Sequence, residues 1–156
     1  MTGRGPAVRL RRATAADADL LLGWANDPAT RAASFHPDPI DAAGHESWLA
    51  ARLASPTTTF WIGEDGGGRP VGQVRVEGEE ISISVAPDLR GRGFGRALLA
   101  AAVEEAGRTL PIERLLARVR VDNPASLSLF AGAGFVELSR GLCEGIPCVE
   151  LGLRLR

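Results

Sequence analysis

The chain has 156 residues, 45% of them hydrophobic, and a formal net charge of −1. This length and composition fit one domain, residues 1–156, with a single core and a loose tail over residues 1–6. The charge balance argues against a general attraction to nucleic acid or to anionic membranes. No apolar run approaches membrane-spanning length, and no apolar segment follows the arginines of the first twelve residues as in a signal peptide. The sequence therefore predicts a soluble, cytoplasmic protein.

The first half of the chain predicts a strand, two helices and three further strands. Apolar and basic side chains alternate over residues 7–13, as in a half-buried strand. Thr14, with Asp17 three residues later, is expected to start a helix. A loop over residues 29–40 and a second helix over residues 42–54 follow. The next three strands are expected at residues 57–63, 71–76 and 79–85.

The second half of the chain alternates predicted helices and strands. These are a helix over residues 94–107, a strand over 114–121, a short helix over 124–131, and strands over 134–139 and 147–155. An antiparallel meander that leads into a β-α-β crossover predicts a mixed α/β sheet and not a doubly wound one. The expected fold therefore has about seven strands, mostly antiparallel, and four helices.

Two cysteines, Cys143 and Cys148, lie close together near the C-terminus. Two cysteines in a chain of this length do not make a disulfide scaffold, and no second group of ligands for zinc accompanies them. We expect them to be ordinary strand and loop cysteines in a reducing cytosol.

The most informative segment joins the strand at residues 79–85 to the helix at residues 94–107. It reads Arg90-Gly91-Arg92-Gly93-Phe94-Gly95-Arg96. The first turn of a helix has four backbone N–H groups without helical acceptors and carries a partial positive charge. Glycines leave these amides open to a ligand and tolerate positive φ. The segment predicts a binding loop for phosphate or pyrophosphate, with the three arginines adding charge at its rim.

Glycine-rich loops before a helix also occur in proteins of several unrelated classes. A glycine-rich loop that binds no ligand is therefore one alternative for this segment. A dinucleotide-binding fingerprint needs glycine where the chain has Arg96, and a parallel βαβ unit near the N-terminus. A Walker loop needs Gly-Lys-Ser/Thr, and the chain has no Lys. An Arg-Gly element for nucleic acid is disfavoured by the near-neutral charge and by the helix that follows.

Two segments resemble motifs of the GNAT superfamily of N-acetyltransferases. Residues 90–95 resemble the family's Arg/Gln-x-x-Gly-x-Gly/Ala motif, whose backbone amides bind the pyrophosphate of acetyl-CoA. Residues 123–135 are similar to its Asn-x-x-Ser/Ala-x-x-x-Tyr-x-x-x-Gly-Phe pattern. The resemblance covers roughly residues 8–155 and implies the GNAT fold, acetyl-CoA as cosubstrate, and acetyl transfer to a primary amine by direct attack. The cofactor-binding residues that it implies are Ile83, Val85, Arg90, Gly91, Arg92, Gly93, Phe94, Gly95, Arg96, Asn123, Ser126 and Phe130.

The same resemblance places the chemistry on the strand at residues 79–85. Something must take a proton from the amine, because an alkyl amine with a pKa of about 10 is mostly protonated at pH 7. Glu79 stands eleven residues before Arg90, where some family members have a glutamate base. Glu77 and Glu80 are further candidates, and the pattern favours solvated carboxylates at a hairpin over a base. The backbone N–H near Val85 is expected to bind the oxyanion, because in the family this strand splays from its neighbour.

Phe130 departs from the family pattern. Many members have Tyr at this position, which is taken to protonate the departing CoA sulfur, and this chain has no Tyr. Phe130 can pack against the pantetheine arm but cannot donate a proton. A thiol pKa of about 8.5 makes thiolate a tolerable leaving group. The alternatives for the group that protonates the sulfur are therefore water, Ser126, Ser128 or no group at all. A CoA-binding relative with weak or no catalysis is the alternative function.

The acceptor side is expected in the first two helices and their connection, which roof the acceptor site in the family. The arrangement of Trp24, Asn26, Asp27, Arg31, His45 and Trp48 resembles the branch that acetylates nucleotide-linked aminosugars. It is also similar to ribosomal-protein acetyltransferases. We expect an amine of a small molecule or a protein N-terminus as acceptor, no nucleic-acid or membrane partner, and a monomer or homodimer. The tryptophans also fit simple core packing, and His45 is expected to be exposed. The candidate acceptor-binding residues are Trp24, Arg31, Phe35, His45 and Trp48.

Overall fold

Seven strands form one mixed sheet in the computed structural model, which describes residues 5–156. The strands are β1 (Arg9–Arg12), β2 (Thr58–Glu64), β3 (Pro70–Glu77), β4 (Glu80–Val85), β5 (Arg114–Arg120), β6 (Val136–Cys143) and β7 (Ile146–Arg154). The helices are α1 (Ala18–Ala25), α2 (Pro28–Ala33), α3 (Ala42–Ala54), α4 (Phe94–Thr109) and α5 (Pro124–Gly132), with short 3₁₀ turns η1 (Ala15–Asp17) and η2 (Pro87–Leu89). The first four residues of the predicted tail lie outside the described residues. None of the helices within residues 5–156 is long and apolar enough to cross a membrane.

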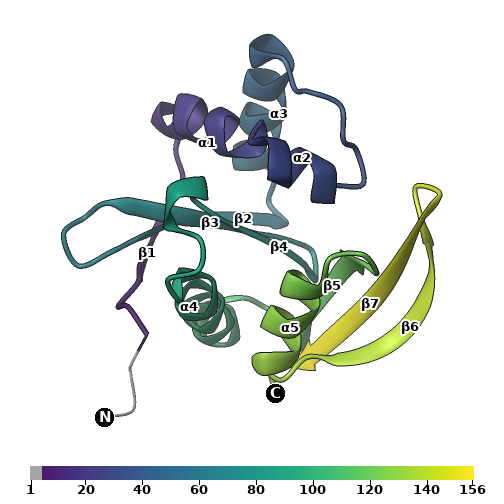
Figure 1. The fold of residues 1–156 in the computed structure, drawn as a ribbon. Coiled ribbons are helices and arrows are strands. Elements are labelled where there is room, and N and C mark those ends of the chain that lie inside the picture. Colours follow the sequence, from purple (N-terminus) through teal and green to yellow (C-terminus); the bar gives the residue numbers. More distant parts are fainter. Residues whose placement is uncertain (1–4) are drawn as a thin grey trace.

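The sheet has the order β1-β2-β3-β4-β5-β7-β6. Strands β2 to β4 form an antiparallel meander to which β1 adds an antiparallel edge strand. Helix α4 crosses over to the parallel strand β5, and β5, β7 and β6 are antiparallel again. Helices α1, α2 and α3 lie on one side of the sheet, and α4 and α5 lie on the other (Figure 1). The predicted meander, crossover and mixed sheet are therefore confirmed.

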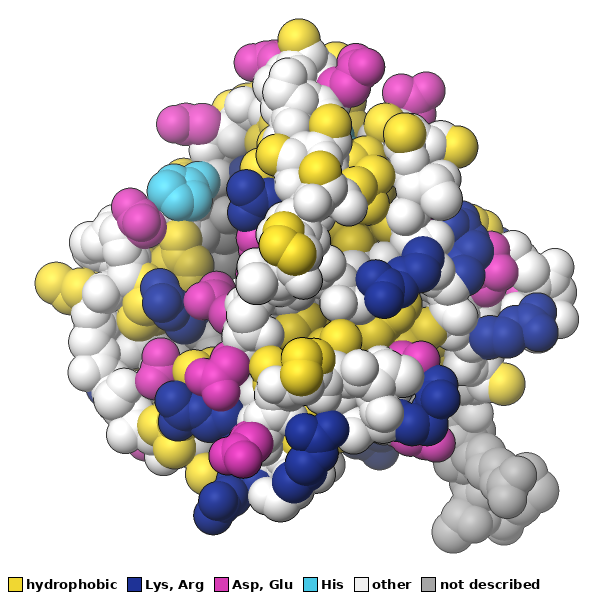
Figure 2. All heavy atoms as spheres, turned by 180° about the vertical axis from the view of Figure 1, so that it is seen from behind, with side chains coloured by type: hydrophobic (Ala, Val, Ile, Leu, Met, Phe, Trp, Pro, Cys, Tyr) yellow, Lys and Arg dark blue, Asp and Glu magenta, His cyan; other side chains and the backbone are white. Residues whose placement is uncertain are grey.

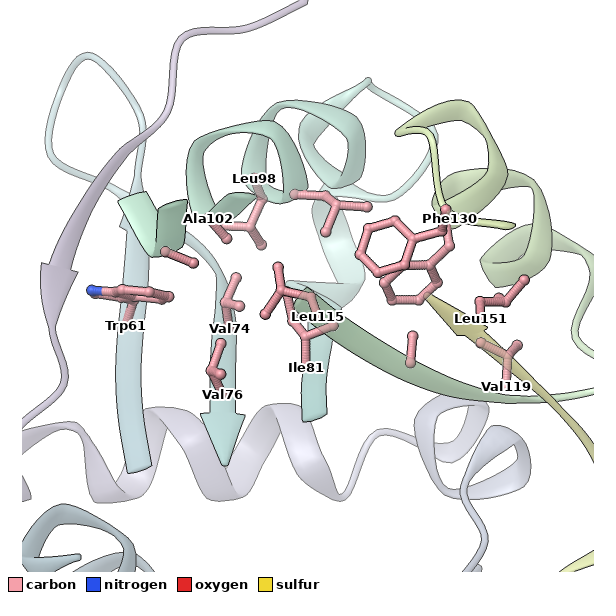
Figure 3. Packing of buried hydrophobic residues seen from close by; sticks show 14 of the residues in the cluster. Trp61, Val74, Val76, Ile81, Leu98, Ala102, Leu115, Val119, Phe130 and Leu151 are labelled. Carbon is pink, nitrogen blue, oxygen red and sulfur yellow. The ribbon is translucent and has the colours of Figure 1, made fainter. Parts of the chain in front are cut away.

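Apolar side chains form a core on each face of the sheet, because successive strand residues point to opposite sides. Beneath α4 and α5, residues such as Val74, Leu98 and Leu115 are fully buried (Figure 3). Beneath α1 and α3, Leu49, Phe60 and Ile62 belong to a second cluster. Fully burying an aliphatic side chain of this size contributes about 1.5–3 kcal/mol. These two cores hold the strand ends that carry the candidate site.

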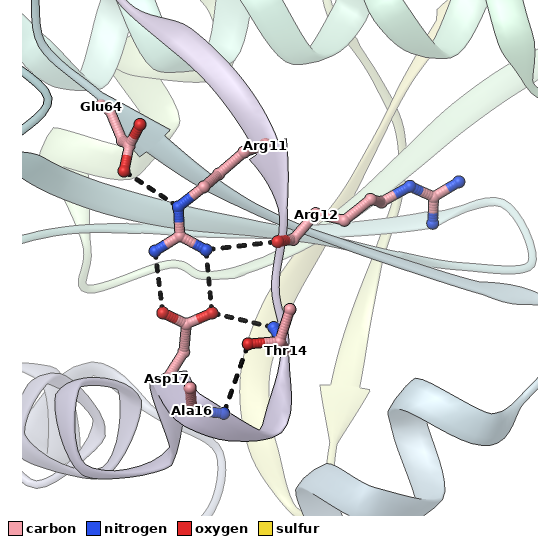
Figure 4. A network of polar contacts seen from close by, with 6 residues as sticks. All are labelled: Arg11, Arg12, Thr14, Ala16, Asp17 and Glu64. Atoms are coloured by element: carbon pink, nitrogen blue, oxygen red, sulfur yellow. Dashed lines mark hydrogen bonds and ion pairs between the residues drawn. The ribbon is translucent and has the colours of Figure 1, made fainter.

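Arg11 joins β1 to the start of the first helical segment (Figure 4). Its guanidinium donates two hydrogen bonds to the Asp17 carboxylate, at 2.8 and 2.9 Å, and one to Glu64 at 2.9 Å. Asp17 also accepts from the backbone N–H of Thr14 at 2.8 Å and completes a capping box. The hydrogen bonds from Arg11 hold the pKa of the buried Asp17 below its ordinary value. The predicted helix start at Thr14 is confirmed, with a 3₁₀ turn before α1.

The predicted loop over residues 29–40 is wrong in its first part, because α2 occupies residues 28–33. This is a fifth α-helix where the sequence predicted four. The segment Asn26-Asp27-Pro28 ends α1, as expected, but it also starts α2. The Asp27 side chain accepts a hydrogen bond from the N–H of Thr30 at 3.1 Å, and Pro28 occupies the first turn, where its missing N–H costs nothing.

The expectation of two unpaired cysteines is also wrong. Cys143 and Cys148 form a disulfide between β6 and β7, with their Cα atoms 5.9 Å apart. Residues 144 and 145 turn the chain with φ values of 51° and 77°, which brings the two strands into a tight hairpin. The cysteines thereby meet across neighbouring strands, which their separation in sequence does not reveal.

Candidate functional site

Strands β4 and β5 pair at one point and then diverge. Within the described residues their ladder is the single pair Glu80 and Leu116, with a hydrogen bond of 2.8 Å from the Leu116 N–H to the Glu79 carbonyl. We call the diverging part, residues 81–85 of β4 and 117–120 of β5, the fork. Glu79 therefore lies beside the point where the strands join, and Val85 lies at the open end.

Backbone groups of β4 point into the fork. On the side of β3, the Ala86 N–H donates to the Val71 carbonyl at 2.8 Å. Because the hydrogen-bonding direction alternates from residue to residue in an antiparallel strand, Ile83 and Val85 direct their N–H and C=O groups away from β3. These two residues have their backbone groups on the side where β5 has moved away. The predicted splaying near Val85 is thus present in the structure.

The glycine-rich loop after η2 has the backbone that an anion-binding loop needs. Gly91 and Gly93 have φ values of 76° and 86°, a left-handed conformation that glycine adopts without strain. Gly93 caps α4 without a side chain, and the first helical hydrogen bond runs from Ala97 N–H to the Gly93 carbonyl at 3.2 Å. Within residues 5–156, the amides of residues 94–96 have no acceptor. These amides fit the pyrophosphate of a nucleotide cosubstrate.

The start of α4 lies close to the open end of the fork. A Cβ atom added at Gly95 would lie 3.5 Å from Val85 and 3.7 Å from Leu129 of α5. On the other side of the loop, a Cβ at Gly93 would lie 3.2 Å from the Cδ of Pro6. The loop is therefore packed between the end of β4, α5 and the N-terminal segment. A ligand that binds the loop amides is placed next to Val85.

The three loop arginines do not act together. Arg90 Nη2 donates to Asp27 Oδ2 at 2.8 Å and to Thr30 Oγ1 at 2.9 Å, so its side chain is directed to α2. This contact holds the pKa of the Asp27 carboxyl below its ordinary value. Arg92 and Arg96 are exposed and have no ion pair in the described part of the chain. The structure thus leaves two of the three arginines available at the rim.

Helix α5 brings the second motif to the other side of the fork. Asn123 is its N-cap and accepts a hydrogen bond from the Ser126 N–H at 3.2 Å. Phe130 is only 4% exposed and meets Phe135 edge to face, with ring centroids 5.0 Å apart. The half-buried Ile83 packs against the same apolar cluster. Phe130 and Ile83, both predicted to bind the cofactor, therefore belong to one cluster beside the fork.

The predicted acceptor residues separate into different environments. Trp24 is 8% exposed and belongs to the core beneath α1 and α3. Arg31 is engaged with the backbone, because its guanidinium donates to the carbonyls of Ala25 and His36, both at 2.6 Å. Phe35 is half-buried in the segment after α2. Arg31 thus ties the ends of α2 to the neighbouring chain.

His45 is buried, which corrects the expectation that it is exposed. Its side chain is 4% exposed, because its position on α3 faces the core, and its ring centroid lies 5.5 Å from that of Trp48. Burial lowers the pKa of His45. The half-buried Trp48 in turn stacks beneath the guanidinium of Arg75, 4.8 Å from the ring centroid. Arg75, on β3, is a residue of this face that the sequence analysis did not single out.

Each of the three candidate bases has an arginine partner. Glu77 accepts from Arg52 at 2.5 Å and from Arg75 at 2.7 Å. Burial raises the pKa of Glu77, but the two arginines outweigh it, so that the pKa is below its ordinary value. The other pairs are Glu79 with Arg114, at 3.3 Å, and Glu80 with Arg118, at 3.5 Å. On the face drawn in Figure 2, basic and acidic side chains are likewise interspersed and not gathered by sign.

The chain matches known acetyltransferases. Residues 7–136 match the family model described as an acetyltransferase (GNAT) domain. Mycothiol acetyltransferase of Nocardioides sp. (strain ATCC BAA-499 / JS614) is 32% identical over 118 residues, 76% of this chain and 36% of that protein. Spermidine N(1)-acetyltransferase of Vibrio cholerae serotype O1 is 34% identical over 58 residues, 37% of this chain and 34% of that protein. The aligned segments therefore span little more than a third of the length of these two curated relatives.

Solved structures show the same fold. Spermidine N-acetyltransferase from Vibrio cholerae, in complex with CoA and spermine, has a TM-score of 0.84 at 20% identity, with 95% of both chains covered. AAC(6')-Ib in complex with ribostamycin and coenzyme A has a TM-score of 0.82 at 20% identity, covering 95% of this chain and 93% of that one. The overall fold is thus shared with proteins whose structures contain CoA.

Proposed function

Because the chain belongs to the GNAT acetyltransferase family, we propose that it transfers an acetyl group from acetyl-CoA to a primary amine by direct attack. The observation that carries the proposal is the placement of the fork beside loop amides without acceptors. In this proposal, the amides of residues 91–96 bind the pyrophosphate, with Arg92 and Arg96 at the rim. The pantetheine arm enters the fork and meets the backbone groups of Ile83 and Val85. Asn123, Ser126 and Phe130 line the side that α5 provides.

The bound acetyl-CoA supplies an activated thioester, and the protein's part is to orient it and to move protons. The N–H near Val85 points into the fork and is the proposed donor to the thioester oxygen, where negative charge develops. The amine nitrogen forms the new bond to the acetyl carbon, the carbon–sulfur bond breaks, and the amine loses a proton. With a thiol pKa of about 8.5, the sulfur can leave as thiolate without a tyrosine.

Glu79 is the proposed base, acting through a chain of waters, because six strand residues, about 20 Å, separate it from Val85. It lies beside the point where β4 and β5 join, and its side chain is 39% exposed, so water reaches it. Its carboxylate lies 3.3 Å from Arg114 Nε, which holds the side chain at the strand end. Glu80, whose exposed side chain lies opposite Arg118, is the next candidate.

For the acceptor, we propose a small molecule or peptide with a single ammonium group, with nucleotide-linked aminosugars and protein N-termini among the candidates. The support is electrostatic, because Glu77, Glu79 and Glu80 already have arginine partners. A polyamine or aminoglycoside would have to displace these arginines to gain carboxylate contacts of its own. We place the protein in the cytoplasm, where acetyl-CoA is available, as a monomer or homodimer.

A CoA-binding relative without turnover is the second candidate. The absence of Tyr from the chain and the burial of Phe130 favour it. A thiol-release screen distinguishes the two, with acetyl-CoA and a panel of aminosugars, amino acids, peptides and polyamines. The enzyme proposal expects amine-dependent thiol release, strongest with a monoamine. Calorimetric binding of CoA with no release from any amine would support the binding protein instead.

A further inference from the structure

Helix α2 is held in place by polar contacts and not by a core. No residue of Pro28–Ala33 is buried. A helix of this length does not persist in water without tertiary contacts. Its position must therefore be set by polar contacts, which are those at its two ends and those of its own Arg31 with the carbonyls of Ala25 and His36.

At its N-terminal end, α2 is held by the glycine-rich loop. Arg90 Nη2 donates to Asp27 Oδ2 at 2.8 Å and to Thr30 Oγ1 at 2.9 Å. Asp27 is also the N-cap, accepting from the Thr30 N–H. The Asp27 side chain is 16% exposed and the Arg90 side chain 41%, so only the carboxylate side of this ion pair is shielded from water.

At its C-terminal end, α2 is held by the last residue of β5. Arg120 Nη1 donates to the carbonyls of Ala32 and Ser34, both at 2.9 Å. The Asp122 carboxylate orients the guanidinium through two hydrogen bonds of 2.8 and 2.9 Å. The last carbonyls of a helix lack helical donors, so an arginine here satisfies groups that would otherwise need water.

Arg90 follows β4, and Arg120 ends β5, so the two arginines extend from the two arms of the fork. We propose that Arg90 and Arg120 are positioning residues that hold α2 across the fork as the roof of the amine entrance. This inference rests on the proposed acetyl transfer. Helices α4 and α5 cover the opposite face of the sheet, so the amine approaches from the side of α2 (Figure 1). The Arg90 side chain then positions the roof over the amine acceptor, while the backbone of its loop binds the cosubstrate.

The test uses Asp27→Asn, which keeps a good N-cap but removes the charge that pairs with Arg90. We expect the KM for the amine to rise about three- to tenfold, as for a partly shielded ion pair, and the Kd for CoA to stay within about twofold. Amide hydrogen exchange over residues 28–34 should accelerate. Arg90→Gln should do the same, and the double variant should be no worse than either single one, because both remove one interaction.

Asp88→Asn is the matched control. Asp88 lies two residues before Arg90 and pairs with Arg69, and within residues 5–156 its side chain has no hydrogen bond or ion pair with α2. It should leave both the exchange rates and the KM for the amine unchanged. If Arg90→Gln weakens CoA binding more than about tenfold while Asp27→Asn changes neither exchange nor KM, Arg90 serves the pyrophosphate and the inference is overturned. If no amine is acetylated at all, the proposed function fails, and unchanged exchange in Asp27→Asn would separately refute the role of Arg90 in holding α2.

Discussion

Gly93→Val is expected to weaken cosubstrate binding, because it displaces the loop amides. A control variant separates this effect from a loss of stability. Gly93 has a φ of 86°, and a non-glycine residue in this region costs about 1–2 kcal/mol. A side chain would also meet Pro6, whose Cδ lies 3.2 Å from the added Cβ. The loop or the N-terminal segment must shift, and the amides of residues 94–96 then lose their common direction. A hydrogen bond to a charged group contributes about 1.5–3 kcal/mol, so losing even one weakens CoA binding roughly 10- to 100-fold.

Gly68→Val is the matched control. Gly68 has a φ of 81° with no atom within 4 Å of its added Cβ, and it lies in the turn between β2 and β3. The backbone strain should cost both variants a similar 1–2 kcal/mol, which lowers Tm by roughly 2–8 °C for a domain of this size. Calorimetric titration with CoA should then separate them. A Gly93→Val protein that binds CoA within about twofold of the parent would show that the loop is not the pyrophosphate site.

Three further predictions concern protons and the second motif. Glu79→Gln should lower kcat at pH 7 by about 10²- to 10⁴-fold with little change in the KM for acetyl-CoA, and the deficit should shrink as pH rises; full kcat at pH 7 would assign the proton to Glu80 or to solvent. Asn123→Asp keeps an N-cap but alters donor capacity beside the fork, so the KM for acetyl-CoA should rise at constant Tm; no change in either quantity would limit Asn123 to capping. Burial lowers the pKa of His45, so the unfolded chain takes up a proton near pH 6.5 that the folded protein resists. Stability should therefore fall as pH drops through 6.5 toward the folded pKa, and chemical denaturation of His45→Gln should show a weaker fall; an identical pH profile would contradict this assignment.

Local signals allowed much of the fold to be predicted from the sequence. The capping box at Thr14, the glycine-rich start of α4 and the Asn-Pro start of α5 each act within a few residues, and each was found where the sequence placed it. The fork was implied by resemblance, and the structure contains it at the predicted strand.

Features that depend on distant partners were missed. The stop signal of α1 is also the start signal of α2, and the decisive contacts of that helix come from Arg90 and Arg120, far along the chain. The disulfide depends on the register of a hairpin, and the burial of His45 depends on how α3 sits on the sheet. None of these partners can be read from spacing alone.

The most direct test of the proposed chemistry is mass spectrometry of the purified protein after incubation with acetyl-CoA and the amine that releases thiol fastest. Direct attack within the fork predicts that the acetyl group appears on the amine, in a one-to-one ratio with released CoA, and that the protein itself gains no acetyl group. An acetylated protein side chain during turnover would contradict direct attack. Unmodified amines throughout, from a protein that still binds CoA, would contradict the acetyltransferase assignment itself.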